Sequence, residues 1–311
     1  MKEHGCTIAD SARATARLCL GLILTWLALG LVAVPPAAAQ LLVVGAKSFT
    51  EQLLMAEMTA ELLRAKGYRV DTRTGFATSG IRREQEVGLV DVYWEYTGTS
   101  LVTFNNVTQK LAGQDAYNRV KELDARKGLI WLTPSKVNNT YALAMRRADA
   151  QARNIQSISD LAVRIRRGET FRLASNTEFY IRPDGLMPMQ RVYGFEFGRE
   201  NVARMSTDAV YDALRDSSEF DVGVVFSTDG RVAAFDFVVL RDDRDYFPSY
   251  LLTPVVRKSI LDKNPELATH LNALAEKLDN ATIARLNAMI DITKTPVRDV
   301  VTGFLQGSGL I

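Results

Sequence analysis

The chain has 311 residues, of which 24% are charged and 47% hydrophobic, with 38 basic against 36 acidic residues. These proportions are ordinary for globular proteins, so they exclude wholesale disorder and a chain made largely of membrane spans. The near balance of charge also argues against a nucleic-acid-binding protein, which usually carries a basic face. A prior of roughly 100–200 residues per domain predicts two domains.

The first 39 residues have the charged, apolar and small-residue order of a secretory signal. Arg13 and Arg17 precede an apolar run over 18–34, and the small residues at 37–39 offer a cleavage site. We therefore expect cleavage after Ala39 and a mature protein in the periplasm. An uncleaved membrane anchor is the alternative, although a run of 17 residues is at the short end for a membrane span.

Cleavage of the signal would remove both cysteines and one of the two histidines from the chain. Cys6, Cys19 and His4 all lie in the signal, so residues 40–311 contain no cysteine and His270 as the single histidine. That composition excludes a disulfide, a thiol nucleophile and a zinc site built from several histidines or thiolates. We expect no cofactor and no metal. The 35 basic and 34 acidic residues that remain give a charge of +1.

The first third of this part has the pattern of alternating strands and helices. An apolar run at 41–44 predicts a strand, and Ser48 and Glu51 have the spacing of a capping box at the start of a helix. Gly67 is well placed to end that helix. Further strands are expected over 68–73 and 90–94, with a helix over 81–87 between them. A strand–helix–strand unit of this length favours a parallel sheet.

The rest of the chain repeats this alternation and then becomes helical. Strands are expected over 140–145, 171–174, 221–226 and 237–240, and helices over 157–167, 183–193, 208–215, 264–278, 282–290 and 296–305. No flexible linker separates the parts, so we predict two α/β lobes that share a ligand-binding cleft. If the chain crosses between them twice, lobe one comprises 41–135 plus 245–311, and lobe two 136–244.

Six segments carry residues that are suited to ligand binding. Each alone is explained as well by an ordinary structural role. Two of them pack aromatic residues or a lysine at the point where a strand ends, a position that suits ligand contact in open sheets. The segments are Gly45–Gln52, Asp91–Thr99, Asn138–Tyr141, Glu178–Gly185, Phe226–Gly230 and Asp245–Tyr250.

Taken in this order, the six segments resemble the osmoprotectant-binding proteins of ABC importers, the ProX/OpuAC group. These proteins show a Lys-x-Phe-Thr-Glu-Gln start, a Tyr-Thr-Gly-Thr turn, an Arg-x-Asp-Gly helix start, a Ser-Thr-Asp segment and a Phe-Pro-x-Tyr loop. The resemblance extends over essentially all of residues 40–311. It implies the α/β fold of a type II periplasmic binding protein, whose two lobes close on glycine betaine, choline, carnitine or a similar solute.

The resemblance also implies which side chains hold the ligand. Tyr96, Tyr141, Phe226 and Tyr250 match an aromatic box for a quaternary ammonium group, which cannot donate hydrogen bonds and is held by π faces. Lys47, Thr99 and Arg182 match the side that binds the carboxylate, and Asn139 completes the set of ligand-binding positions. The implied partners are the small zwitterionic or quaternary-ammonium solute and the permease subunits of an ABC transporter. A monomer is expected, with no nucleic acid and with membrane contact only through the transporter.

The sequence departs from the betaine-binding pattern at two positions. Phe226 stands where the box usually has Tyr, and Asn139 stands where an acidic residue is often found. Both changes reduce the attraction for a cation, because Phe has no hydroxyl and the amide has no charge. The alternatives are therefore the same fold with a different zwitterion or amino acid, or a sensory input. A secreted hydrolase that uses Asp91 and Glu95 is a third candidate, but we expect no enzyme.

Overall fold

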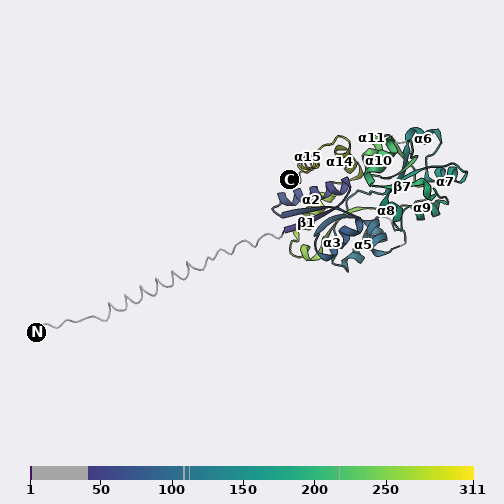
Figure 1. The fold of residues 1–311 in the computed structure, drawn as a ribbon. Helices are drawn as coiled ribbons and strands as arrows, with labels where there is room; N and C mark the ends of the chain where they lie inside the picture. Colours follow the sequence, from purple (N-terminus) through teal and green to yellow (C-terminus); the bar gives the residue numbers. More distant parts are fainter. Residues whose placement is uncertain (2–40, 108, 112, 217) are drawn as a thin grey trace. The chain divides into compact units, whose positions relative to one another are not determined.

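Residues 41–311 of this computed structural model form one compact unit, and the structure describes them apart from residues 108, 112 and 217. The expected signal over residues 1–39 lies outside the described residues, apart from Met1. No helix in the described part is long and apolar enough to cross a membrane. The unit contains two sheets of five strands each, flanked by helices, and so has the predicted α/β architecture (Figure 1).

The first sheet has the strand order β2-β1-β3-β10-β4. β1 pairs in parallel with β2 and with β3, as the strand–helix–strand pattern predicts, whereas β10 is antiparallel to both of its neighbours. The strands are β1 (Leu41–Lys47), β2 (Arg69–Phe76), β3 (Val92–Tyr96), β4 (Leu129–Trp131) and β10 (Leu252–Arg257).

Helices cover both faces of the first sheet. Successive side chains of β1 point to opposite faces of the sheet. On one face, Leu42, Val44 and Ala46 share a core with two residues of the long helix α2 (Thr50–Ala65), Ala56 and Leu63. Val43 packs with the cluster on the opposite face. The other helices of this half are α3 (Thr78–Val87), α4 (Thr97–Thr99), a π-helical turn (Ser100–Phe104), α5 (Gly113–Ala125), α12 (Lys258–Leu261), α13 (Glu266–Glu276), α14 (Asn280–Asp291) and α15 (Val297–Gly307).

The second sheet has the order β7-β6-β8-β5-β9 and repeats the plan of the first. β6 is parallel to β7 and β8, and β5 is antiparallel to β8 and β9. Its strands are β5 (Tyr141–Arg146), β6 (Leu173–Asn176), β7 (Val202–Met205), β8 (Val222–Phe226) and β9 (Phe237–Val239). Its helices are α6 (Arg147–Ala152), α7 (Ile158–Arg166), α8 (Thr177–Ile181), α9 (Leu186–Tyr193), a 3-10 turn (Arg199–Asn201), α10 (Thr207–Asp216) and α11 (Arg231–Ala234).

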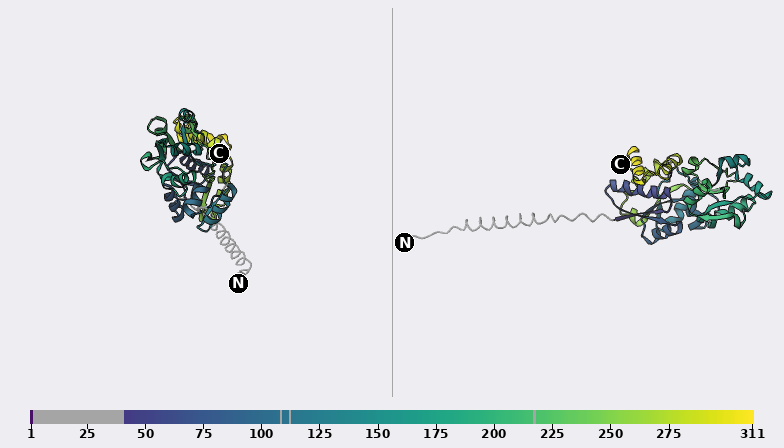
Figure 2. Two further views of the ribbon diagram at one scale, coloured as in Figure 1. Left: turned by 90° about the vertical axis from the view of Figure 1, so that its right-hand side faces the viewer. Right: turned by 45° about the horizontal axis from the view of Figure 1, so that its top comes forward.

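Two segments connect the sheets, and they lie side by side. The chain leaves the first sheet after Trp131 and returns to it at Leu252. The backbone nitrogen of Asn139 donates to the carbonyl of Tyr250, and that of Leu252 donates to the carbonyl of Val137. We call 132–140 and 240–251 the crossing segments. In Figures 1 and 2, α14 and α15 lie beside α2, whereas α6 and α7 lie at the far end with the second sheet.

A buried ion pair stabilises the first half near the end of β3. Arg82 of α3 donates two hydrogen bonds of 2.7 Å to Asp124 of α5, and the Asp124 side chain is fully buried. The same carboxylate accepts from Ser100, Asn105 and Trp131. It therefore fixes the turn that follows Thr99 as well as the position of α5.

Replacement of Asp124 by Ala is expected to lower the free energy of unfolding by about 3–5 kcal/mol, since it removes the buried bidentate partner of Arg82 and leaves that guanidinium with one bond, from its Nε to the exposed Glu86. Urea denaturation measures the change. Glu122→Ala is the matched control on the same helix, because Glu122 pairs with Arg119 and Arg126 at an exposed site and should cost about 0–1 kcal/mol. Equal losses of unfolding free energy in the two variants would contradict the stabilising role assigned to the Arg82–Asp124 pair.

Candidate functional site

The ends of four strands bring the predicted aromatic residues together. Tyr96 ends β3 and pairs in register with Leu252, while Tyr141 begins β5 and pairs with Phe226 at the end of β8. Tyr250 lies in the crossing segment just before β10. Parallel strands thus point their carboxyl ends at one place from both sheets, which is where ligands bind in open α/β sheets.

A cavity of about 440 Å³ opens at this place, between residues of the two sheets. Of the eight predicted ligand-binding residues, seven line it: Lys47, Tyr96, Thr99, Asn139, Tyr141, Phe226 and Tyr250. Arg182 does not line it but lies directly behind it. Its guanidinium is 3.4 Å from the hydroxyls of both Thr99 and Tyr250 and lies over the rings of Tyr141 and Tyr250. The structure therefore brings all eight residues together.

The aromatic rings form a connected row rather than four isolated walls. Tyr141 lies 4.8 Å from Phe226 and 6.0 Å from Tyr250, measured between ring centroids. Phe49, which was not among the eight predicted ligand-binding residues, stacks at 5.5 Å on Phe226 and at 6.4 Å on Tyr96. Phe49 thus links the ring from the first sheet with a ring from the second.

Glycine is needed in the turn that follows Tyr96. A Cβ atom on Gly98 would lie 2.8 Å from the carbonyl oxygen of Ser249 and 2.9 Å from the Tyr250 ring. Thr97 ties the same turn to the crossing segment, since its hydroxyl donates to Ser249 and accepts from the backbone of Leu251. The Thr-Gly-Thr sequence therefore sets the distance between Tyr96 and Tyr250.

Both predicted cations already have buried acidic partners. Lys47 donates to Glu95 at 2.6 Å, and both side chains are nearly inaccessible to solvent. Arg182 makes a bidentate pair with Asp184 and a third bond of 3.1 Å to Glu178. With the two long bonds to Thr99 and Tyr250, all five N–H groups of Arg182 are used. A ligand carboxylate can reach this guanidinium only by replacing the long bonds.

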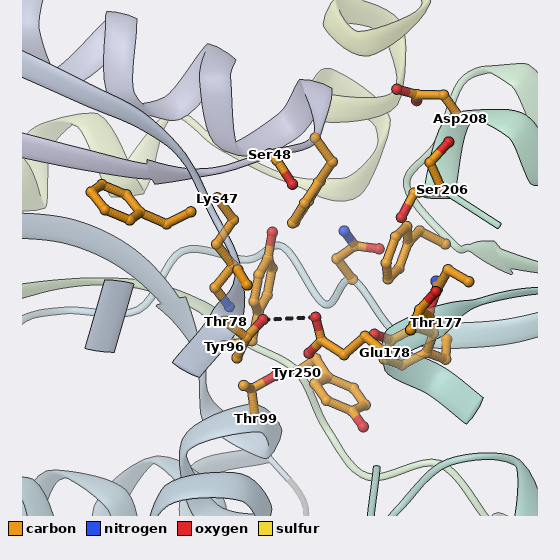
Figure 3. A pocket seen from close by; sticks show the side chains of 18 of the residues that line it. Lys47, Ser48, Thr78, Tyr96, Thr99, Thr177, Glu178, Ser206, Asp208 and Tyr250 are labelled. Carbon is orange, nitrogen blue, oxygen red and sulfur yellow. Dashed lines mark hydrogen bonds between the residues drawn. The ribbon is translucent and has the colours of Figure 1, made fainter. Parts of the chain in front are cut away.

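Several lining residues had no motif that would have identified them. Thr78, at the start of α3, donates a hydrogen bond of 2.9 Å to Glu178 of α8, and this bond crosses the cavity from one half to the other (Figure 3). Ser206, just before α10, and Asp208, in the first turn of α10, also line the cavity. No sequence motif identifies Thr78, Ser206 or Asp208 as site residues, because they reach the cavity only through the packing of the two halves.

The two carboxylates proposed for a hydrolase are both occupied in other roles. Asp91 accepts from the backbone of Val43 and pairs with Arg257, which fastens β1 to β10. Glu95 is fully buried against Lys47. Neither carboxylate lines the cavity. Within the described ranges, no group of three or more acidic, His or Cys side chains could hold a metal ion.

The predicted capping box at the start of α2 is wrong. Phe49, not Ser48, occupies the position before the helix, and it has no side-chain cap. The Glu51 side chain instead points away from the helix end. Its carboxylate accepts hydrogen bonds from Tyr96, Asn139 and Thr228, and only 2% of the residue is exposed. Spacing alone does not reveal this, because buried tertiary partners compete with the local cap.

The model of the substrate-binding domain of ABC-type glycine betaine transport systems, OpuAC, matches residues 40–307. The chain belongs to this family. A glycine-betaine-binding protein of Pseudomonas aeruginosa is 42% identical over 288 residues, which cover 91% of this chain and 92% of the relative.

Solved structures agree with the family. Ligand-free YehZ from Escherichia coli is 31% identical with a TM-score of 0.65, and the match covers 88% of this chain and 100% of that one. A glycine betaine/carnitine/choline ABC transporter structure is 26% identical with a TM-score of 0.70, over 86% and 99% of the two chains. The predicted two-lobe, type II periplasmic binding protein fold is thereby confirmed.

Burial raises the pKa of Glu51 above its ordinary value, although the hydrogen bonds from Thr228, Tyr96 and Asn139 oppose the shift. Because the folded pKa exceeds the unfolded one, the folded state binds the extra proton, and this contribution to stability is lost as the pH rises through the folded pKa. Glu51→Gln removes the titration. We therefore expect the unfolding free energy of the variant, relative to the unmodified chain, to increase as the pH is raised above about 4.5.

Chemical denaturation at a series of pH values measures this difference. Glu57→Gln serves as the control, because Glu57 lies on the same helix and pairs with Arg64 at 3.8 Å near the surface. A pH-independent difference between Glu51→Gln and the unmodified chain would contradict the expectation.

Proposed function

We propose that the chain binds a quaternary-ammonium osmoprotectant, such as glycine betaine, in the cavity between its sheets and delivers it to the permease of an ABC importer. The row of rings carries this proposal, since a trimethylammonium group offers no hydrogen-bond donor and is held by π faces at about 0.5–2 kcal/mol per contact. The relatives that bind glycine betaine support the choice of ligand.

The binding mechanism that we propose is closure of two lobes on the ligand. Lobe one would comprise residues 41–135 and 245–311, and lobe two residues 136–244. All strands of the first sheet fall in the former ranges and all strands of the second sheet in the latter, which supports this division. A ligand that contacts rings from both lobes stabilises the closed state over the open one, and the permease would recognise that state.

Each site residue has a proposed role in this mechanism. Tyr96, Tyr141, Phe226 and Tyr250 would surround the ammonium group. The carboxylate would lie toward Lys47, Thr99 and Arg182, where it would replace the long bonds that Arg182 makes to hydroxyls. Asn139 would offer its side-chain oxygen, which accepts no hydrogen bond among the described residues. We further propose that the protein acts as a periplasmic monomer without catalytic activity.

Calorimetric titration of residues 40–311 tests the function. The panel comprises glycine betaine, choline, carnitine, proline betaine, ectoine and proline. Dissociation constants in the micromolar range for a quaternary ammonium compound are expected. Binding of ectoine or proline alone would move the function to another zwitterion or amino acid, and no binding by folded protein would remove the osmoprotectant assignment.

Tyr96→Leu is expected to weaken binding of the best ligand by about tenfold or more, because the substitution keeps apolar volume but removes a π face and its electrostatic attraction. The same titration measures the loss. Tyr117→Leu is the matched control, since Tyr117 is a buried tyrosine of the same half that lies outside the cavity and donates to the backbone of Leu132. Similar affinities for Tyr96→Leu and Tyr117→Leu would contradict the assigned site.

A further inference from the structure

Glu178 places a carboxylate on the wall of the cavity. It lies in the first turn of α8, and its side chain is 38% exposed. Figure 3 shows the carboxylate pointing toward Thr78 of the other half. One oxygen accepts from a guanidinium nitrogen of Arg182 at 3.1 Å, and the other accepts from the Thr78 hydroxyl at 2.9 Å. Contact with solvent and a cationic partner both favour the ionised form of this carboxylate.

The charged groups on the side of the cavity that would receive a ligand carboxylate do not balance. Lys47 pairs with Glu95 at 2.6 Å. Arg182 makes its bidentate pair with Asp184. Glu178 is a third carboxylate beside these two cations. The five groups together therefore carry one surplus negative charge.

A ligand carboxylate at Arg182 would compete with Glu178 for one donor atom. The guanidinium nitrogen that donates to the Thr99 hydroxyl at 3.4 Å also donates to Glu178 at 3.1 Å. A carboxylate that replaced the long bond to Thr99 would thus share this nitrogen with Glu178. Two like charges so close together repel each other, and water screens the repulsion weakly because the Arg182 side chain is only 3% exposed. A neutral hydroxyl in the same place would meet no such repulsion.

The positive end of the ligand does not cancel this effect. Glycine betaine and choline have the same trimethylammonium group, so any attraction between that group and Glu178 acts on both compounds. Their other ends differ, since betaine ends in a carboxylate and choline in a neutral hydroxyl. The charge of Glu178 therefore separates these two ligands through the end that approaches Arg182.

We propose that Glu178 is the specificity-determining residue for the second end of the ligand: its charge disfavours a carboxylate and shifts the preference of the cavity toward quaternary ammonium compounds that end in a neutral hydroxyl. This inference rests on the proposed function, because it concerns which members of that ligand class the same cavity favours. The bond to Arg182 keeps the charge of Glu178 beside the guanidinium.

Calorimetric titration with glycine betaine and with choline tests the inference. The quantity compared is the ratio of the two dissociation constants in the unmodified chain and in Glu178→Gln. Gln keeps the size of the side chain, and it can still accept from Arg182 with its oxygen and donate to the Thr78 hydroxyl with its amide, so the substitution removes mainly the charge. We expect Glu178→Gln to improve the affinity for betaine relative to choline by about five-fold or more.

Glu169→Gln is the matched control. Glu169 lies in the same half, its side chain is 39% exposed, and it pairs with Arg164 at 3.0 Å, so it resembles Glu178 in exposure and in ion pairing. It does not line the cavity, and its replacement should leave the ratio unchanged. If Glu178→Gln does not fold, Glu178→Ala takes its place with the same expected direction, since it also removes the charge.

Thr78→Val separates the charge from the hydrogen bond across the cavity. This substitution removes the bond but keeps the charge, which Arg182 still holds in place. Whatever its effect on the two affinities themselves, their ratio should stay close to that of the unmodified chain. A change of the ratio as large as that in Glu178→Gln would overturn the inference, because the bond rather than the charge would then set the preference.

The outcomes separate this inference from the proposed function. An unchanged ratio in Glu178→Gln, with the compounds still bound, overturns the inference and leaves the function in place. Loss of affinity for both compounds by the same factor also overturns it, since that result indicates a structural role alone. A relative loss of betaine affinity contradicts the expected direction and overturns it as well.

If the unmodified chain binds neither compound, the proposed function fails and acetate, the simplest carboxylate probe, decides the inference. NMR follows the Nε–H signal of Arg182, assigned by Arg182→Lys, during titration with acetate. The signal should respond at an acetate concentration about five-fold lower in Glu178→Gln than in the unmodified chain or in Glu169→Gln. Equal responses in the three proteins, or no response in any of them, would overturn the inference by this route.

Discussion

The side-by-side course of the two crossing segments is the constraint on which the cleft depends. Because the backbones at 137–139 and 250–252 are hydrogen-bonded to each other, the start of β5 and the start of β10 lie close together. Each of these strands then enters its sheet antiparallel to the strand whose end faces the cavity. Tyr96, Tyr141, Phe226 and Tyr250 converge as a consequence, although 154 positions separate the first from the last.

The buried cations beside the cleft already have acidic partners. Lys47 pairs with Glu95, and Arg182 pairs with Asp184. Loss of one partner from either pair would leave a buried charge without its counter-charge and would lower the stability of the fold. A ligand carboxylate would cost the least interaction energy at Arg182 if it replaced the two long bonds to Thr99 and Tyr250. Under the proposed function, the ammonium end would meet the row of rings and the carboxylate end would meet hydroxyls and the paired cations, so the two ends of a zwitterion would be held by different interactions.

Contacts away from the cavity also join the two halves. A Cβ atom on Gly230, just before α11, would lie 2.5 Å from Ala288 of α14, so a glycine allows these helices to approach. Arg231 then lies 3.8 Å from Asp291 at the end of α14. The C-terminal helices therefore pack on α2 and also contact an element of the second half.

Local signals predicted most elements but failed where tertiary partners intervened. Ser157 and Asp160 form the capping box that their spacing indicates, because nothing buried competes for them. Ser48 and Glu51 have the same spacing, yet the buried Glu51 carboxylate accepts hydrogen bonds from three residues elsewhere in the chain and does not cap the helix. β10 was not expected, since Pro254 interrupts the pattern of a central strand. The short helices α4, α8, α11 and α12, the longer α5 and the short strand β4 were also not expected.

Residue patterns were enough to predict the alternation of strands and helices, the resemblance to a family and the eight candidate residues, because periodicity and ordered motifs are local properties of the chain. They could not determine that Lys47 and Arg182 are already paired, that Phe49 completes the row of rings, or that Thr78 meets Glu178. Those facts depend on distances between residues far apart in the chain. Only the tertiary structure decides them, since it sets which buried charge finds which partner when the two sheets face one another.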